Sequence, residues 1–160
     1  YTLFMVVSSP TKLNVEGDNI SGISNESIDA GTFLQGSDAM PYGQLSVGFN
    51  SNSNLLFGHN LNDLNVPVSR SSDFRLLTMK FSTIDGMTAF INNSDVPLAN
   101  DASLNLPLTS NNGLKLNASS LSSPGDNTRS QVVEIRAYNV ALTDFDRLQI
   151  ANVILNKYGL

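Results

Sequence analysis

The sequence predicts an all-β protein, a two-sheet antiparallel β-sandwich of the jelly-roll type with one C-terminal helix. Three observations lead to this fold class. Short segments of alternating apolar and polar residues recur along the chain, separated by turn-forming residues. Asparagine and serine fill the stretches between them, and both residues favour turns over helices. Only the stretch from Ala141 onward repeats its apolar residues at helical spacing.

The composition fits one folded domain and excludes several classes of function. With 160 residues, of which 41% are hydrophobic, we expect a single domain over residues 1–160. A net charge of -5 and scattered basic residues argue against a nucleic-acid partner, and no apolar run is long enough for a membrane span. The absence of cysteine excludes disulfides and thiolate zinc sites. Because the chain begins with Tyr1 rather than methionine, we expect a processed product or a piece of a longer protein.

The strands are expected in short segments that turn residues separate. The first, "YTLFMVVSS" (1–9), is apolar on both faces, which is typical of a central strand. Residues 11–31 are expected to be loop, as is most of the Asn-rich stretch 49–65. The other expected strands are "GTFLQ" (31–35), "GQLSVGFN" (43–50), "NLLFGHN" (54–60), "SSDFRLLTMKFST" (71–83), "MTAFINN" (87–93), "GLKLNAS" (113–119) and "QVVEIRAYN" (131–139).

Alternation within two of these segments predicts which side chains share a face of the strand. In residues 71–83, one face carries Leu77, Met79 and Phe81, and the other carries Leu76, Thr78 and Lys80. In residues 131–139, the side chains expected to point inward are Val133, Ile135 and Ala137, with Glu134 and Arg136 outward. The pair Asp85-Gly86 between two alternating runs predicts a β-hairpin.

The C-terminal helix has clear start and stop signals. Thr143 is a good N-cap, and Asp146 three residues later completes a capping box. Gly159 is placed to end the helix in the left-handed conformation. Its apolar face is predicted to comprise Phe145, Leu148, Ala151, Ile154, Leu155 and Tyr158. An amphipathic helix must cover an apolar surface, and the sheets are the simplest partner.

The C-terminal motif resembles that of a known family. A strand ending in Tyr138-Asn139 is followed by "ALTD" (141–144), a helix and "KYGL" (157–160), as in LamG-like jelly-roll domains of bacterial and phage type. These domains belong to the concanavalin A-like lectin/glucanase superfamily. The opening strand and the hairpin at 74–96 are also similar, although Asn92-Asn93 stands where the family has Asn-Gly. The resemblance implies two antiparallel sheets with the terminal helix packed near the edge of the sandwich.

The residues needed for catalysis are not found in a recognisable pattern. Glycosidases of the superfamily carry clustered acids on one strand, whereas Glu134 stands alone on its strand. We therefore expect Glu134 to be an outward structural carboxylate, either beside Arg136 or at an edge. His59 is the single histidine and no nucleophile motif accompanies it. We expect no enzymatic activity, and a glycoside hydrolase ranks last among the readings.

The candidate ligand-binding residues are Tyr42, His59 and Asn60, since a glycan site needs an aromatic surface and polar groups. The plainer alternatives are that Tyr42 anchors a loop on the core and that His59 is an ordinary loop residue. No cofactor is expected. Calcium remains an alternative because the turns "EGDN" (16–19) and "PGDN" (124–127) offer oxygen ligands, although such turns are common without metal.

Two functions of different class follow. The first is a non-catalytic structural or adhesion module of a surface assembly, such as a phage capsid decoration, tail or fibre protein or a bacterial surface protein. Its partners would be other protein subunits, and its location the virion or the cell exterior. The alternative is a carbohydrate-binding lectin domain, with or without calcium. One module can serve both functions.

Overall fold

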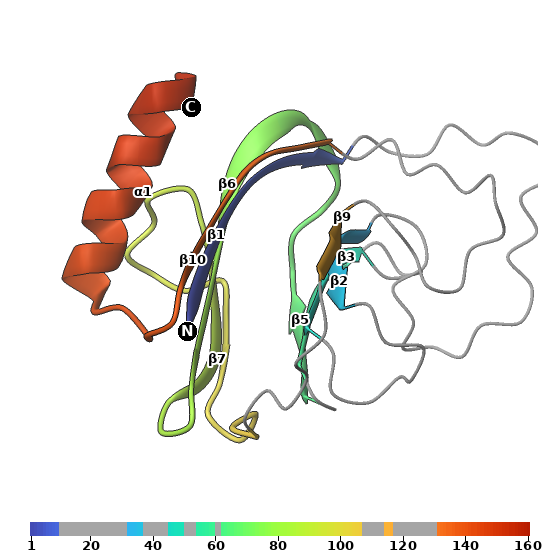
Figure 1. Ribbon diagram of the computed structural model, residues 1–160, viewed down its shortest axis with the longest axis vertical. Helices are drawn as coiled ribbons and strands as arrows, with labels where there is room; N and C mark the ends of the chain where they lie inside the picture. Colours follow the sequence, from blue (N-terminus) through green and yellow to red (C-terminus); the bar gives the residue numbers. More distant parts are fainter. Residues whose placement is uncertain (10–31, 37–44, 50–53, 60–61, 107–113, 117–130) are drawn as a thin grey trace, which may run out of the picture.

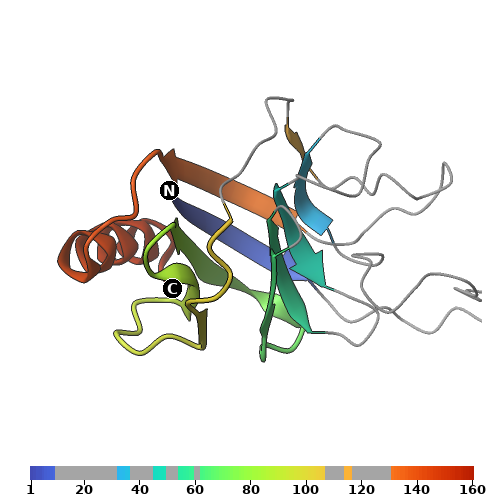
Figure 2. The same cartoon turned by 90° about the horizontal axis from the view of Figure 1, so that it is seen from below.

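The computed structural model contains two antiparallel sheets and one C-terminal helix, α1 (Asp144–Tyr158) (Figure 1). The structure describes residues 1–9, 32–36, 45–49, 54–59, 62–106, 114–116 and 131–160. The first sheet lies between α1 and the second sheet (Figures 1 and 2). No helix of the described ranges is long and apolar enough to cross a membrane.

The first sheet has the strand order β10-β1-β6-β7-β8. Its strands are β1 (Thr2–Ser9), β6 (Ser71–Ser82), β7 (Gly86–Ile91), β8 (Ala99–Asp101) and β10 (Gln131–Tyr138). The first strand pairs with β6 on one side and β10 on the other, as expected of a strand that is apolar on both faces. The three-residue strand β8 was not predicted, because it is too short to show a periodic pattern.

The second sheet has the order β5-β4-β3-β2-β9. Its strands are β2 (Thr32–Gly36), β3 (Leu45–Phe49), β4 (Leu55–His59), β5 (Asn62–Val66) and β9 (Leu114–Leu116). Strand β5 lies in the stretch expected to be loop. It is stabilised by pairing with β4 and by burying Leu64 and Val66, so tertiary contacts override its Asn-rich composition.

Side chains from both sheets meet in one core. From the first sheet the buried members are Leu3, Met5, Val7, Leu77, Met79, Phe81, Met87 and Ala89. From the second they are Leu45, Val47, Leu55, Phe57, Leu64 and Val66. Leu77, Met79 and Phe81 share one face of β6 as the alternation predicted, and this is the face that lies in the core.

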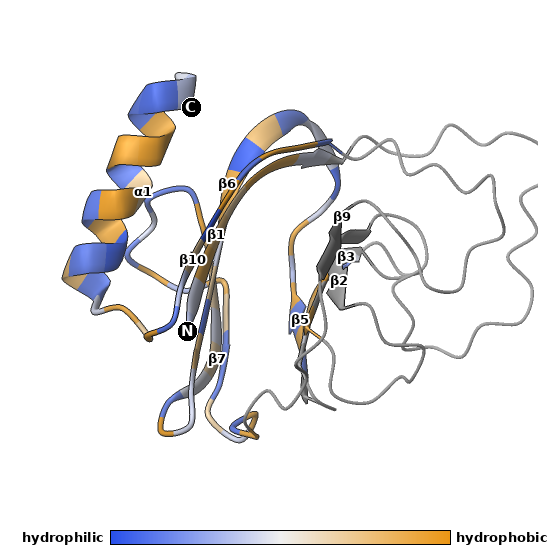
Figure 3. Ribbon diagram, viewed as in Figure 1, coloured by the Kyte–Doolittle hydropathy of each residue, from blue (hydrophilic) through white to orange (hydrophobic). Residues whose placement is uncertain are grey.

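The opposite face of the first sheet, which we call the outer face, packs against α1. This second cluster comprises Phe4, Val6, Leu76, Ala151, Ile154 and Leu155. Apolar and polar residues alternate along the helix (Figure 3). Both predicted caps are confirmed: the Thr143 hydroxyl accepts a hydrogen bond from the Asp146 N–H, and Gly159 is left-handed at φ 67°.

One predicted member of the apolar helix face is wrong. The Phe145 side chain is 71% exposed, whereas Arg147 is fully buried. The buried residues Arg147, Ala151 and Leu155 follow each other at intervals of four, which defines the stripe that meets the sheet. Phe145 lies outside that stripe, and hydrophobicity at helical spacing could not exclude it.

The inward positions of β10 also differ from expectation. Val6 pairs with Glu134 and Val7 with Val132, so Val133 is an extra residue in a β-bulge. Val133 is consequently 47% exposed, and Val132 packs against the core instead. Ile135 packs against the core as predicted, whereas Ala137 is exposed.

The predicted hairpin between β6 and β7 is confirmed. Gly86 has φ 73°, and a Cβ there would lie 2.1 Å from the backbone oxygen of Asp101. The Ser82 hydroxyl accepts hydrogen bonds from the N–H groups of Ile84 and Asp85, which closes the turn. Asn92 follows β7 with φ 52°, the positive φ that asparagine tolerates well.

Candidate functional site

The polar side chains of the outer face form the best-defined polar network among the described residues. Glu134 on β10 is its centre. The carboxylate accepts hydrogen bonds from Lys157 Nζ and from the Tyr158 hydroxyl, both at 2.6 Å, and a third from Arg136 Nε. Because Lys157 and Tyr158 belong to the last turn of α1, Glu134 joins this turn to the edge of the first sheet.

These donors stabilise the charged form of Glu134. The hydrogen bond from Lys157 contributes most, followed by the one from Tyr158, and together they lower the pKa of the carboxyl from 4.5 to about 2. An acid held this strongly in the ionised form is a poor proton donor at neutral pH. Glu134 lies beside Arg136 as predicted. The predicted outward position is wrong, because the last turn of α1 covers the carboxylate and leaves its side chain only 14% exposed.

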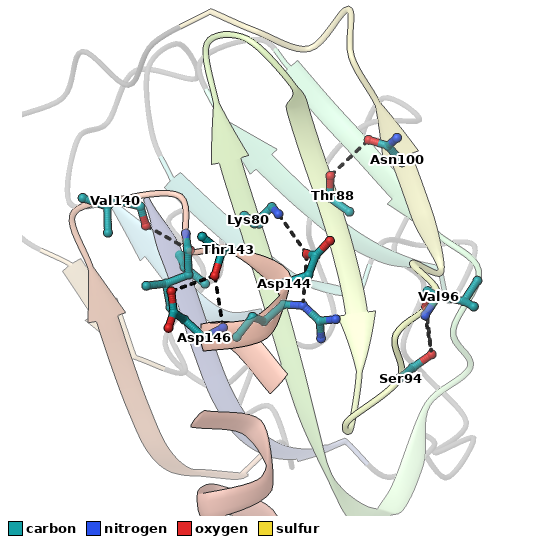
Figure 4. A network of polar contacts seen from close by, with 12 residues as sticks. Lys80, Thr88, Ser94, Val96, Asn100, Val140, Thr143, Asp144 and Asp146 are labelled. Carbon is teal, nitrogen blue, oxygen red and sulfur yellow. Dashed lines mark hydrogen bonds and ion pairs between the residues drawn. The ribbon is translucent and has the colours of Figure 1, made fainter. Parts of the chain in front are cut away.

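A second ion cluster lies at the opposite end of α1. Asp144 Oδ1 accepts a hydrogen bond from Lys80 Nζ at 3.1 Å and lies 3.7 Å from Arg147 Nε (Figure 4). Lys80 belongs to β6 and Asp144 to the first turn of α1, where a carboxylate also interacts favourably with the helix dipole. The two ends of α1 are thus each joined to the first sheet by charged groups.

Arg147 is the buried charge of this region. Its guanidinium carbon lies 3.7 Å from the centre of the Phe90 ring on β7, a cation–π arrangement. Burial lowers the pKa of Arg147, and the nearby carboxylates of Asp144 and Asp95 oppose this effect. None of its three side-chain nitrogens has a hydrogen-bond partner among the described residues. Sequence reasoning missed this residue because basic residues are usually exposed.

The connection between β10 and α1 is held by Thr2. Its buried hydroxyl donates to the backbone oxygen of Val140 at 3.0 Å and accepts from the Leu142 N–H at 2.9 Å. Toward the other edge of the same sheet, Thr88 donates to Asn100 Oδ1 and thereby joins β7 to β8 (Figure 4).

The structure describes only one of the three predicted ligand-binding residues. Tyr42 and Asn60 lie outside the described residues. His59 is the last residue of β4, and its backbone pairs with Leu45 at the start of β3 and with Asn62 at the start of β5. The end of β4 therefore lies beside the start of β3. The first residue of β3, Leu45, follows Tyr42 by three positions in the sequence.

The possible calcium ligands also fall outside the described residues, since both turns, 16–19 and 124–127, do so. Within the described part of the chain, no group of three or more His, Cys, Asp or Glu residues could hold a metal ion.

Comparisons with known proteins identify no relative that would define the site. No model of a known protein family matches the chain. No curated protein matches it either.

Proposed function

We propose that the chain is a non-catalytic structural or adhesion module of a surface assembly. The observation that carries this proposal is the set of hydrogen bonds that Glu134 accepts. The only glutamate of the described residues accepts hydrogen bonds from Arg136 on its own strand and from Lys157 and Tyr158 on α1. These contacts join β10 to the helix and support a structural role for Glu134. In the same way Lys80 and Asp144 join β6 to the helix.

The exposed apolar residues near the C-terminus support contact with other proteins. Phe145 is 71% exposed and Val153 is 59% exposed on the outward side of α1. Val133 on the β10 bulge and Val140 before the helix are also exposed. Aromatic and aliphatic side chains at such positions are typical contributors to protein–protein interfaces.

The fold proposed for this module is a LamG-like jelly roll of the concanavalin A-like type. In support, Lys157 and Tyr158 of the "KYGL" motif bind Glu134, and Gly159 ends the helix. Asn92 supports it as well, because it adopts the positive φ that Asn-Gly turns require. A virion or cell-exterior location belongs to the same proposal.

The test is whether the purified chain associates through the outward side of α1. Multi-angle light scattering over a concentration series should show association that weakens in a Phe145→Ser, Val153→Ser double variant. The matched control is Ile84→Ser, which removes an aliphatic residue that is 86% exposed from the β6–β7 turn. A chain that stays monomeric up to millimolar concentration would contradict self-assembly as the mode of action.

A carbohydrate-binding lectin domain is the second candidate. The register of β3 and β4 favours it, because His59 at the end of β4 pairs with Leu45 at the start of β3, and Asn60 and Tyr42 are close to these two residues in the sequence. A glycan array with calcium and then with a chelator tests this candidate. Specific binding that Tyr42→Ala abolishes would establish a lectin, and loss of binding with chelator would add calcium. An array without signal would contradict the lectin function.

A further inference from the structure

The interface between α1 and the first sheet contains an incompletely compensated charge. Arg147 is fully buried there, and its nearest carboxylate, Asp144, lies 3.7 Å from Nε, beyond normal hydrogen-bond distance. Thr78 Oγ1 is also buried without a hydrogen-bond partner among the described residues. Thr78 pairs with Phe90, the residue on which Arg147 stacks, so the unsatisfied groups belong to one region.

Such groups weaken the attachment of the helix. Burial removes such groups from bulk water, and among the described residues neither finds a hydrogen-bond partner, which disfavours the docked state. The contact with Phe90 recovers only part of this loss for Arg147. Were α1 to leave the sheet, the guanidinium would regain its water.

The apolar contact between α1 and the sheet is small compared with the core between the two sheets. Its buried apolar side chains are Ala151, Ile154 and Leu155, with Ile150 and Tyr158 partly buried beside them. In each ion pair at its two ends one side chain is largely exposed, Asp144 at 67% and Lys157 at 54%, so water screens both pairs. The Glu134 contacts at the last turn of α1 are the stronger of the two, since that carboxylate also binds Tyr158 and is only 14% exposed. By contrast, β1 is hydrogen-bonded along both edges and is buried on both faces.

We propose that α1 opens as a separate unit, leaving the first sheet while the two sheets remain folded, and that Arg147 is the residue that makes this opening easy. The connection up to Leu142 stays in place because Thr2 holds it, so the hinge lies at the start of the helix. Opening exposes Phe4, Val6 and Leu76. A 15-residue helix is marginal in water by itself, so its amides exchange once it is released.

The experiment is native-state hydrogen exchange of the full chain at increasing low denaturant concentrations. We expect the amides of α1 to exchange at least about tenfold faster than those of β1 and β6. Their exchange should also depend less on denaturant concentration, because the opening exposes less surface than unfolding of the sheets. Exchange of α1, β1 and β6 as one cooperative unit would overturn the proposal.

Two variants separate this opening from global unfolding. Leu64→Ala weakens the core at β5, away from the helix, and should speed exchange of β1 and β6 while leaving α1 unchanged. Equal acceleration in all three elements would show that α1 opens only with the whole protein. Arg147→Met should slow exchange of α1 by about tenfold. Faster α1 exchange in this variant would show that Arg147 strengthens docking, contrary to the proposal.

Arg75→Met is the matched control for the removal of an arginine. Arg75 lies on β6 and donates to the Ser69 backbone oxygen, at a site exposed to solvent. The exchange of α1 is expected to be the same in this variant as in the wild type. A slowing equal to that of Arg147→Met would show that the effect comes from the loss of one positive charge anywhere on the protein rather than from the buried guanidinium.

Discussion

The Thr2 hydroxyl accepts a hydrogen bond from the Leu142 N–H, so the first residue of β1 holds the segment that leads into α1, 140 residues later in the chain. The same hydroxyl donates to Val140. This one buried side chain therefore satisfies two backbone groups of a connection that has no regular structure of its own.

Replacing Thr2 by valine should destabilise the protein. The substitution keeps the shape but leaves the Val140 oxygen and the Leu142 N–H without their partner, which costs about 1–3 kcal/mol of unfolding free energy. Chemical denaturation measures the change. Thr2→Ser retains the hydroxyl and should lose less, and an equal loss in both variants would mean that the methyl group rather than the hydrogen bonds is responsible.

The Glu134 cluster should make stability depend on pH in the acid range. The folded pKa of about 2 lies below the ordinary value of 4.5, so this contribution is fully present above pH 4.5 and is lost as the pH falls toward 2. Glu134→Gln should lower the unfolding free energy at pH 7 by about 1–2 kcal/mol and flatten the pH profile.

Unfolding free energies measured between pH 2 and 7 test this expectation. The difference between wild type and Glu134→Gln should shrink as the pH falls. Tyr158→Phe removes one of the three donors and should show a smaller pH effect in the same range. A constant difference between wild type and Glu134→Gln would show that the Glu134 carboxylate is not held in its charged form.

Two glycines with similar backbone angles should respond very differently to alanine. At Gly86, with φ 73°, a Cβ would lie 2.1 Å from the Asp101 oxygen, so we expect a loss above about 2 kcal/mol. At Gly159, with φ 67°, no atom lies within 4 Å, and only the backbone preference of about 1 kcal/mol is lost. Thermal unfolding of both variants measures the two losses of stability. Equal losses would contradict the close approach of Gly86 to Asp101.

The orientation of α1 can be tested by two truncations on the same helix. Ile154→Ala removes a fully buried side chain and should cost about 2–5 kcal/mol of unfolding free energy. Phe145→Ala removes a larger side chain that is 71% exposed, and the change should stay within about 0.5 kcal/mol. A larger loss at Phe145 than at Ile154 would mean that the helix presents the opposite side to the sheet.

Several elements could be predicted because their signals are local. The caps at Thr143 and Gly159 depend on side-chain and backbone chemistry within one turn. The hairpin at Asp85-Gly86 depends on adjacent residues, and so does the alternation in β6. The sequence likewise indicated a structural role for Glu134, since no second acid shares its strand.

Other features depend on partners far away in the chain. Strand β5 forms because β4 offers an edge and the core accepts Leu64, although its own composition favours a loop. Tyr42 and Asn60 stay predictions, and so does a binding role for His59, because composition cannot place a ligand.

By itself, the sequence determined the strand-rich class, the two antiparallel sheets expected from alternation, and the limits of the helix. Only the tertiary structure decided that Arg147 is buried while Phe145 is exposed, that Val133 bulges outward, and that Glu134 binds the last turn of α1. The physical reason is that periodicity shows which side chains share a face of one element. The face that becomes buried, and the partner it meets, follow from how all the elements pack together.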